Sequence, residues 1–276
     1  QHIKINKKNA YLSESCDSIC WLFNIRAQDL EYSPLIMAKS IIHKDGNCFI
    51  FSDQKALKNE TLSNKIKIIY KPLKHFDSHF SKYKESIKSY LCAPNETSFN
   101  TIMSIKKIGA KFIFKENIID ILKATKNKTE ENGMRNAHIR DGVALTRFIY
   151  WIKNTKNYPQ TEVSASNYLD NLRIKNKNFF SLSFPTIAGS GPNGAIVHYR
   201  ASKKSNRKIK NDDLFLVDSG AQYFDGTTDV TRTIAFSKVT QEQKKMYTLV
   251  LKGHIAVALS TFSENERGKL LDKHAR

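Results

Sequence analysis

Two aspartates in one glycine-punctuated stretch are the residues whose type and spacing best suit metal chemistry. Asp218 and Asp229 lie within LFLVDSGAQYFDGTTDVTRTIAF at residues 214–236, where an apolar run and a Thr/Val/Ile-rich run flank a polar bend. Strand-forming residues on both sides of turn-forming residues predict a β-hairpin. Because divalent cations prefer oxygen ligands, two carboxylates carried by one hairpin could share such ions.

The pairing register of this hairpin decides whether the two acids can cooperate. A two-residue Asp-Gly turn would separate them by four residues along the strands, about 13 Å, which is too far for one metal cluster. A longer loop over residues 222–225 would set Asp218 directly opposite Asp229. We favour the longer loop because it leaves two bulky aromatic residues at the tip. On spacing alone, turn-forming and strand-capping acids are the more common interpretation.

A histidine at the end of the preceding apolar segment is the second candidate. Residues 179–200, FFSLSFPTIAGSGPNGAIVHYR, have strand-like ends around a middle rich in Gly, Ser, Pro and Asn. We expect an apolar strand that ends on His198 and presents the imidazole beside the hairpin, where it could hydrogen-bond a substrate or move a proton near neutral pH. Taken alone, a strand-end histidine without a role is more common. The glycines do not match a phosphate-binding loop.

Other histidines carry weaker signals. His75 and His79 are four residues apart on one predicted helix face, but no third metal ligand accompanies them, and a solvated face is expected. His138 lies in a long amphipathic helical pattern, where a surface or helix-packing role is expected.

The elements that must position these residues differ between the two ends of the chain. Residues 1–118 alternate apolar strand patterns at 36–43, 48–51 and 111–114 with helical spacing at 76–91, which predicts an α/β domain.

The second segment, residues 119–276, is dominated by helical patterns around the hairpin. These patterns extend from the end of the first segment, at 117–123, into 129–153, and recur at 161–174 and 240–259. With 276 residues, two domains are expected.

Charge and cysteine content narrow the function classes. The chain has 45 basic and 26 acidic residues, a net charge of +19 and a pI of about 9.7. The lysines are spread evenly, and clusters such as residues 203–210 are short and lack aromatic residues, so nucleic acid is not the expected partner.

Four cysteines without a metal or disulfide pattern suit reduced thiols in the cytoplasm. No apolar run approaches the ~18 residues needed to span a membrane.

Four motifs in order carry a family resemblance. They are WLFNIRAQD at 21–29, GMRNAHIRDGVAL at 133–145, SFPTIAGSGPNGAIVHYR at 183–200 and LVDSGAQYFDGTTDVTRT at 216–233. Together they resemble aminopeptidase P, the Xaa-Pro aminopeptidase of the creatinase/methionine-aminopeptidase superfamily, whose catalytic domain has the pita-bread fold. The resemblance implies a non-catalytic creatinase-like α/β domain at 1–118, followed at 119–276 by the first part of an α+β pita-bread domain.

The resemblance also implies an activity and roles for individual residues. Asp218 and Asp229 match two metal-ligand aspartates, and His198 matches a histidine that holds the substrate and stabilises the transition state. Two divalent ions, usually manganese, activate a bridging water that attacks the bond before proline in peptides with proline in second position. Family members usually dimerise, so a homodimer is a further expectation.

The sequence departs from the family pattern after residue 233. The family's remaining ligands, a histidine flanked by glycines and two glutamates, have no counterpart among the later residues. We therefore expect a chain truncated at both ends, which does not catalyse alone and which exposes apolar surface and unpaired strand edges. The alternative is a non-catalytic remnant or interaction protein, with nucleic-acid association through its charge.

Overall fold

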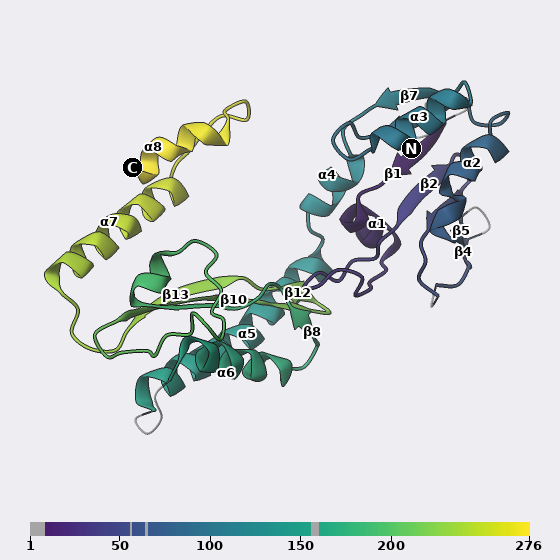
Figure 1. Cartoon of the computed structure of the whole chain (residues 1–276). Coiled ribbons are helices and arrows are strands. Elements are labelled where there is room, and N and C mark those ends of the chain that lie inside the picture. The colour runs from purple at the N-terminus through teal and green to yellow at the C-terminus, as the bar shows by residue number, and fades with distance from the viewer. Residues whose placement is uncertain (1–8, 56, 64–65, 156–159) are drawn as a thin grey trace. The chain divides into compact units, whose positions relative to one another are not determined.

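The computed structural model describes residues 9–55, 57–63, 66–155 and 160–276, and these form two compact units (Figure 1). The first unit contains the described residues up to Val143, together with Arg173–Pro185 and Gly220–Asp229. The second contains Ala144–Leu172, Thr186–Ser219 and Val230–Arg276.

A mixed seven-stranded sheet is the centre of the first unit, with strand order β4-β5-β3-β2-β1-β6-β7. The pairs β1–β6, β6–β7 and β3–β5 are parallel, whereas β1–β2, β2–β3 and β4–β5 are antiparallel. The strands are β1 (Asn9–Ser13), β2 (Lys39–His43), β3 (Asn47–Phe51), β4 (Glu60–Ser63), β5 (Ile66–Lys71), β6 (Ser89–Cys92) and β7 (Lys111–Phe114).

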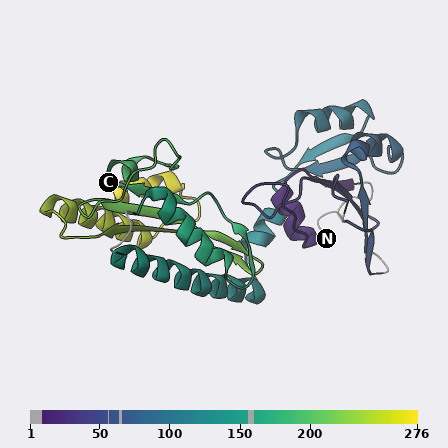
Figure 2. The same ribbon diagram turned by 60° about the horizontal axis from the view of Figure 1, so that its bottom comes forward.

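Helices cover both faces of this sheet, as Figure 2 shows from a second direction. They are α1 (Cys16–Phe23), α2 (Phe76–Lys82), α3 (Phe99–Lys107) and α4 (Ile118–Ala124), with the 3-10 helix η2 (Leu73–His75) before α2. On β3, Phe49 and Phe51 enter the core shared with α2 and α3, while Cys48 and Ile50 enter the core beneath α1. This alternation of faces explains why the strand is apolar throughout.

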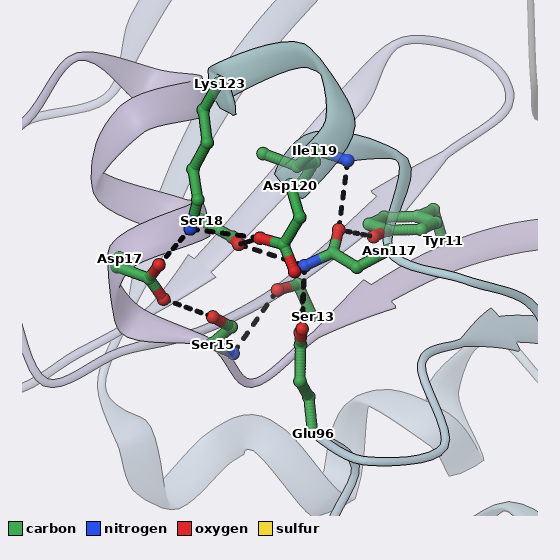
Figure 3. Close-up of polar contacts among 10 residues, drawn as sticks. All are labelled: Tyr11, Ser13, Ser15, Asp17, Ser18, Glu96, Asn117, Ile119, Asp120 and Lys123. Carbon is green, nitrogen blue, oxygen red and sulfur yellow. Dashed lines mark hydrogen bonds and ion pairs between the residues drawn. The ribbon is translucent and has the colours of Figure 1, made fainter. Parts of the chain in front are cut away.

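A cluster of polar contacts connects α4 to the α/β sheet (Figure 3). Asn117, the N-cap of α4, accepts from the Tyr11 hydroxyl at 2.7 Å and donates to Glu96 at 2.9 Å. Ser18 on α1 donates to Asp120 at 3.0 Å, and Lys123 pairs with Asp120 at 3.0 Å. Burial raises the pKa of Glu96. The polar groups of this cluster satisfy one another's hydrogen-bonding capacity, which gives the cluster a structural role.

The first unit also contains a three-stranded sheet, β12-β11-β8, packed on the long helix α5 (Lys128–Asn154). Its strands are β8 (Phe179–Leu182), β11 (Ala221–Tyr223) and β12 (Gly226–Thr227). Asp141 of α5 forms a fully buried ion pair with Arg173, at 2.7 Å and 2.8 Å, and accepts from the Tyr223 hydroxyl at 2.8 Å. The buried carboxylate is thus satisfied from two directions.

The second unit is built on the sheet β13-β10-β9, with one face covered by α5 and α6 (Glu162–Ile174). Phe215 and Val217 of β10 pack against Phe148 and Leu169 in this core. The strands are β9 (Ile187–Ser190), β10 (Leu214–Ser219) and β13 (Val230–Ala235), and the 3-10 helix η3 (Gly191–Ala195) follows β9.

The final helices have little cover. They are α7 (Gln241–Ala258), η4 (Gly268–Leu271) and α8 (Asp272–Ala275). Thr240 caps α7 in a capping box with Gln243, and no residue of α7 is buried. None of the helices in the described part of the chain combines the length and apolar character that a membrane crossing needs.

The predicted elements are confirmed except at two places. The helix expected over residues 76–91 ends at Lys82, and its last residues form β6 between β1 and β7. Tyr83 and Ile87 have helical spacing, yet they are joined by a turn in which the Ile87 N–H donates to the Tyr83 carbonyl at 2.8 Å. The second difference is at His198, where a strand end is expected and the structure has a turn. The predicted domain boundary between residues 118 and 119 stays a prediction.

Candidate metal centre

Asp218 lies near the end of β10, on the face of the sheet that α5 and α6 do not cover. Side chains alternate along the strand, so Phe215 and Val217 enter the helix-covered core while Leu216 and Asp218 point to the other face. The Oδ1 atom of Asp218 is buried, and no described residue gives it a hydrogen bond. A buried carboxylate oxygen without a donor is costly, and a bound cation would satisfy it.

Asp229 ends the last segment of the first unit and is exposed. The residue before it is firmly held: the Thr228 N–H donates to the Ala221 carbonyl at 2.9 Å, and the Thr228 carbonyl accepts from the Ser183 hydroxyl at 2.9 Å. A side chain on Gly220 would place its Cβ 1.9 Å from the Thr228 oxygen, so glycine is required there. The backbone leading into Asp229 is therefore fixed, while its carboxylate is free to bind a ligand.

The hairpin has a register between the two considered from the sequence. Asp218 pairs with Thr231, and Gln222 pairs with Thr227, so both parts of the hairpin share one register and the two-residue loop is Phe224-Asp225. The favoured pairing of Asp218 with Asp229 is therefore wrong. Asp229 lies outside the paired strands, directly before β13 begins at Val230.

His198 does not end a strand, which corrects the prediction from its apolar surroundings. Strand β9 ends at Ser190, η3 follows, and His198 lies in a turn with a φ of 53°. Its side chain is exposed, as are the neighbouring Ile196 and Val197. The apolar residues before His198 thus face outward from a turn, where they resemble a buried strand in composition alone.

Asp218 and Asp229 each carry the hard oxygen donors that divalent cations such as Mn²⁺ prefer. Within the described ranges, no group of three or more His, Cys, Asp or Glu side chains is arranged to hold a metal ion. Asp218 and His198 belong to the second unit and Asp229 to the first. The donor type therefore fits, whereas the number of donors falls short of a binuclear hydrolytic site.

His79 is the histidine that the sequence placed wrongly. It is 5% exposed, and its Nε2 lies 2.8 Å from Nε2 of His43, which is 6% exposed. His75 is exposed, as expected for a solvated helix face, and His138 is exposed on α5. The pairing partner of His79 lies on β2, thirty-six residues away, so helical spacing could not reveal it.

Glu162 is a further residue that sequence reasoning did not single out. It occupies the first position of α6, where an acidic residue ordinarily interacts with the helix N-terminus at the surface. Here the side chain is fully buried, and its carboxylate accepts hydrogen bonds from the segment that contains His198. The TEV triplet at the start of this helix gave no sign of those partners.

Comparison with known families agrees with this architecture. Residues 132–276 match the metallopeptidase family M24, and residues 1–130 match the creatinase/prolidase N-terminal domain. These two matches confirm the expected order of a creatinase-like domain followed by part of a pita-bread domain. They also confirm the family resemblance carried by the four motifs.

Individual relatives extend beyond this chain. The Xaa-Pro aminopeptidase ApepP of Drosophila melanogaster is 34% identical over 100% of this chain and 46% of its own length. A probable Xaa-Pro aminopeptidase P of Paracoccidioides brasiliensis is 36% identical over 100% of this chain and 47% of its own. The chain spans about half the length of these curated relatives.

A solved structure shows the same coverage. The X-prolyl aminopeptidase of Caenorhabditis elegans, described as a cytosolic enzyme with a di-nuclear active site, aligns with a TM-score of 0.86 and 30% identity. The alignment covers 100% of this chain and 46% of that one. An Xaa-Pro dipeptidase from Bacillus anthracis, at 20% identity and a TM-score of 0.73, shares the fold.

Proposed function

Because the chain belongs to metallopeptidase family M24, we propose that it is part of a metal-dependent aminopeptidase that hydrolyses the X-Pro bond at peptide N-termini. The observation that carries this proposal is the similarity to Xaa-Pro aminopeptidases along the whole chain, including the segment with Asp218 and Asp229. The buried Oδ1 of Asp218, which has no donor among the described residues, supports a cation at that position.

In this proposal Asp218 and Asp229 hold two divalent ions, with manganese as the expected metal. When bound, such ions supply charge stabilisation and lower the pKa of a water. His198 is exposed on its turn, and an imidazole N–H there would donate to the oxygen of the scissile carbonyl as negative charge develops on it. Residues beyond Arg276 would supply the histidine and the glutamates that complete the ligand set.

The substrates, assembly and compartment follow from the same proposal. The substrates of the longer polypeptide are peptides with proline in second position, and its assembly is a homodimer. Cys16, Cys20, Cys48 and Cys92 are all free thiols, which suits a reducing cytoplasm. Burial raises the pKa of the Cys48 thiol to about 11, so this thiol is unreactive near neutral pH.

Metal binding by this chain provides the first test. Two carboxylates should hold Mn²⁺ weakly, with a Kd on the order of 10⁻⁴ to 10⁻³ M. We expect titration calorimetry or the electron paramagnetic resonance signal of free Mn²⁺ to show this binding, and Asp218→Asn to abolish it. Asp212→Asn, which alters an exposed acid outside the proposed centre, is the matched control. Equal Mn²⁺ binding by the Asp218 variant and the parent chain would contradict the ligand assignment.

Turnover provides the second test and separates the enzyme from a non-catalytic relative. The polypeptide that continues past Arg276 should release the first residue of X-Pro peptides when Mn²⁺ is present, and residues 1–276 alone should not. Turnover by the isolated chain would show that the proposed ligand set is wrong. If the longer polypeptide has no activity but binds a random DNA duplex with a steep salt dependence, the chain is an interaction protein instead.

A further inference from the structure

Glu162 is a buried carboxylate whose partners in the described part of the chain are all neutral. Its exposed fraction is 0%. The carboxylate accepts from the Ser190 N–H at 2.8 Å, the Asn193 side-chain amide at 2.9 Å, the Tyr199 hydroxyl at 2.8 Å and the Arg207 N–H at 3.0 Å. A buried carboxylate that collects four donors, two of them backbone amides, fixes the positions of all the groups that supply them.

The four donors lie on both sides of His198 in the chain. Ser190 ends β9 and Asn193 lies in η3, before the histidine. Tyr199 follows His198 directly, and Arg207 lies nine residues beyond His198. One side chain at the start of α6 therefore ties together the whole segment from residue 190 to residue 207, while the His198 imidazole stays exposed.

The backbone at His198 needs such support. Its φ of 53° lies in the left-handed region, which costs a non-glycine residue conformational energy and persists where neighbouring contacts enforce it. The turn is closed by the Tyr199 N–H, which donates to the Ile196 carbonyl at 3.2 Å. The Ile196 N–H in turn donates to the Asn193 carbonyl at 3.2 Å. Asn193 and Tyr199, at the two ends of this turn, are both bound to Glu162.

We propose that Glu162 is a positioning residue for His198: its buried carboxylate locks Asn193 and Tyr199, and these hold the exposed imidazole in the orientation that the reaction requires. Glu162 does not touch the substrate in this scheme. The catalytic part of the inference rests on the role proposed for His198, whereas the structural part concerns this chain alone.

Further contacts agree with this assignment. The Tyr199 ring is 7% exposed, and Asn193 also donates to the Tyr199 hydroxyl at 2.8 Å, so both ends of the turn are linked directly. Burial raises the pKa of Tyr199, and the neighbouring Glu162 carboxylate raises it further, which keeps the phenol protonated as a donor.

Hydrogen exchange in this chain tests the structural part. Glu162→Gln replaces one acceptor oxygen with an NH₂ group that faces donors, so amide exchange in the peptide covering residues 191–200 should be faster by roughly tenfold or more. Tyr199→Phe removes one link and should give a smaller increase in the same peptide. It also keeps the inference testable if Glu162→Gln does not fold.

The matched control is Asp170→Asn, further along α6. The Asp170 carboxylate accepts from the Thr186 hydroxyl at 2.6 Å, directly before the start of β9 and thus at the opposite end of this strand from the turn. This variant should leave exchange in residues 191–200 unchanged. Parent-like exchange in the Glu162 and Tyr199 variants, or an equal increase in the Asp170 variant, would overturn the inference.

Kinetics of the longer polypeptide test the catalytic part. Glu162→Gln should lower kcat about tenfold or more with a small change in KM, as expected when a transition-state contact is misplaced. In a His198→Asn background the same change should have little further effect, because the residue it positions is gone. An unchanged kcat, or additive losses in the double variant, would overturn the positioning role. Absence of all X-Pro activity would count against the proposed function, while the exchange result would still decide whether Glu162 holds the turn.

Discussion

His43 and His79 form the most unusual side-chain pair in the α/β domain. Their Nε2 atoms are 2.8 Å apart, so one ring donates and the other accepts, and the accepting ring must be neutral. The rings of Phe49 and Tyr83 pack against the two imidazoles and against each other. The ring centroids in these contacts lie 4.5–5.6 Å apart. Burial lowers the pKa of His43 to about 4 and that of His79 to about 3.

These pKa values predict acid-sensitive stability. The negative charge of the nearby Asp45 opposes the lowering of the His43 pKa. Interactions with His43 and Lys82 lower the His79 pKa further. Because the folded-state pKa values lie below the ordinary histidine value of 6.5, the unfolded chain takes up protons first as the pH falls. The free energy of unfolding should be unaffected by the pair above about pH 6.5 and should decrease from there toward pH 4, by about 1.4 kcal/mol per pH unit for each histidine.

Urea unfolding at several pH values measures this loss. A double variant, His43→Leu with His79→Leu, removes both titrating groups together and should flatten the dependence of unfolding free energy on pH between 6.5 and 4. His75→Gln, at an exposed histidine just before α2, should keep the parental pH dependence. A parental slope in the double variant would show that other groups cause the acid sensitivity.

At this scale, the sequence identified residues by type and by family resemblance, but not by their partners. Asp218, Asp229 and His198 stood out because carboxylates and an imidazole lie in recognisable motifs. The partners of Glu162 lie 28 to 45 residues away, and those of His79 on another element, so no local pattern reveals them. Burial of a polar residue depends on these distant donors, which only the fold brings together.

Two glycines on helix α5 show how tightly this element packs against the hairpin loop. A Cβ on Gly133 would lie 2.2 Å from the carbonyl oxygen of Asp225, whereas a Cβ on Gly142 would meet nothing within 4 Å. The loop cannot easily retreat, because Asp225 forms an ion pair with Arg140 and the Phe224 N–H donates to Asn178 at 2.9 Å. Gly133 is therefore required by close approach, and Gly142 is not.

Alanine substitutions at the two glycines should have opposite effects. Gly133→Ala should destabilise the chain by about 1–3 kcal/mol, because the hairpin loop must shift to admit the methyl group. Gly142→Ala should stabilise it by about 0.5–1 kcal/mol, because alanine loses less backbone entropy in a helix. Thermal or urea unfolding of both variants measures the difference. Destabilisation of equal size at both positions would mean that helix α5, and not its contact with the loop, responds to the change.

Elements were predictable from the sequence wherever periodicity and turn residues agreed. The β2–β3 hairpin, the helices α5 to α7 and strand β7 followed from apolar spacing and their bounding residues. Residues 83–91 were assigned to a helix because Tyr83, Ile87 and Leu91 fit its period. A central strand that is buried on both faces carries no alternation to oppose that fit. The hairpin register could not be predicted from the sequence, because it depends on the close approach of Gly220 to the Thr228 carbonyl, which residue spacing does not show.

For the molecule as a whole, exposed apolar surface and high net charge act against each other. Helix α7 has no buried residue, and Tyr247, Val250 and Leu259 are 62%, 74% and 77% exposed. Strand β13 is an edge of its sheet in the described structure. Apolar helices and open strand edges promote association, whereas a net charge of +19 opposes it by repulsion between copies.

The balance between these two forces predicts salt-dependent self-association. In low salt, repulsion should keep the chain largely monomeric at micromolar concentration. At about 0.5 M salt the screening length falls to a few ångströms, so the apolar contacts should prevail and larger species should form. Sedimentation velocity at both salt concentrations measures this shift.

Two variants of α7 test which surface is responsible. Val250→Glu places a charge on the exposed apolar face of α7 and should reduce association in high salt. Lys252→Glu, at an exposed position of the same helix that is already polar, should reduce association much less. A monodisperse monomer in high salt would show that the exposed face of α7 does not drive association.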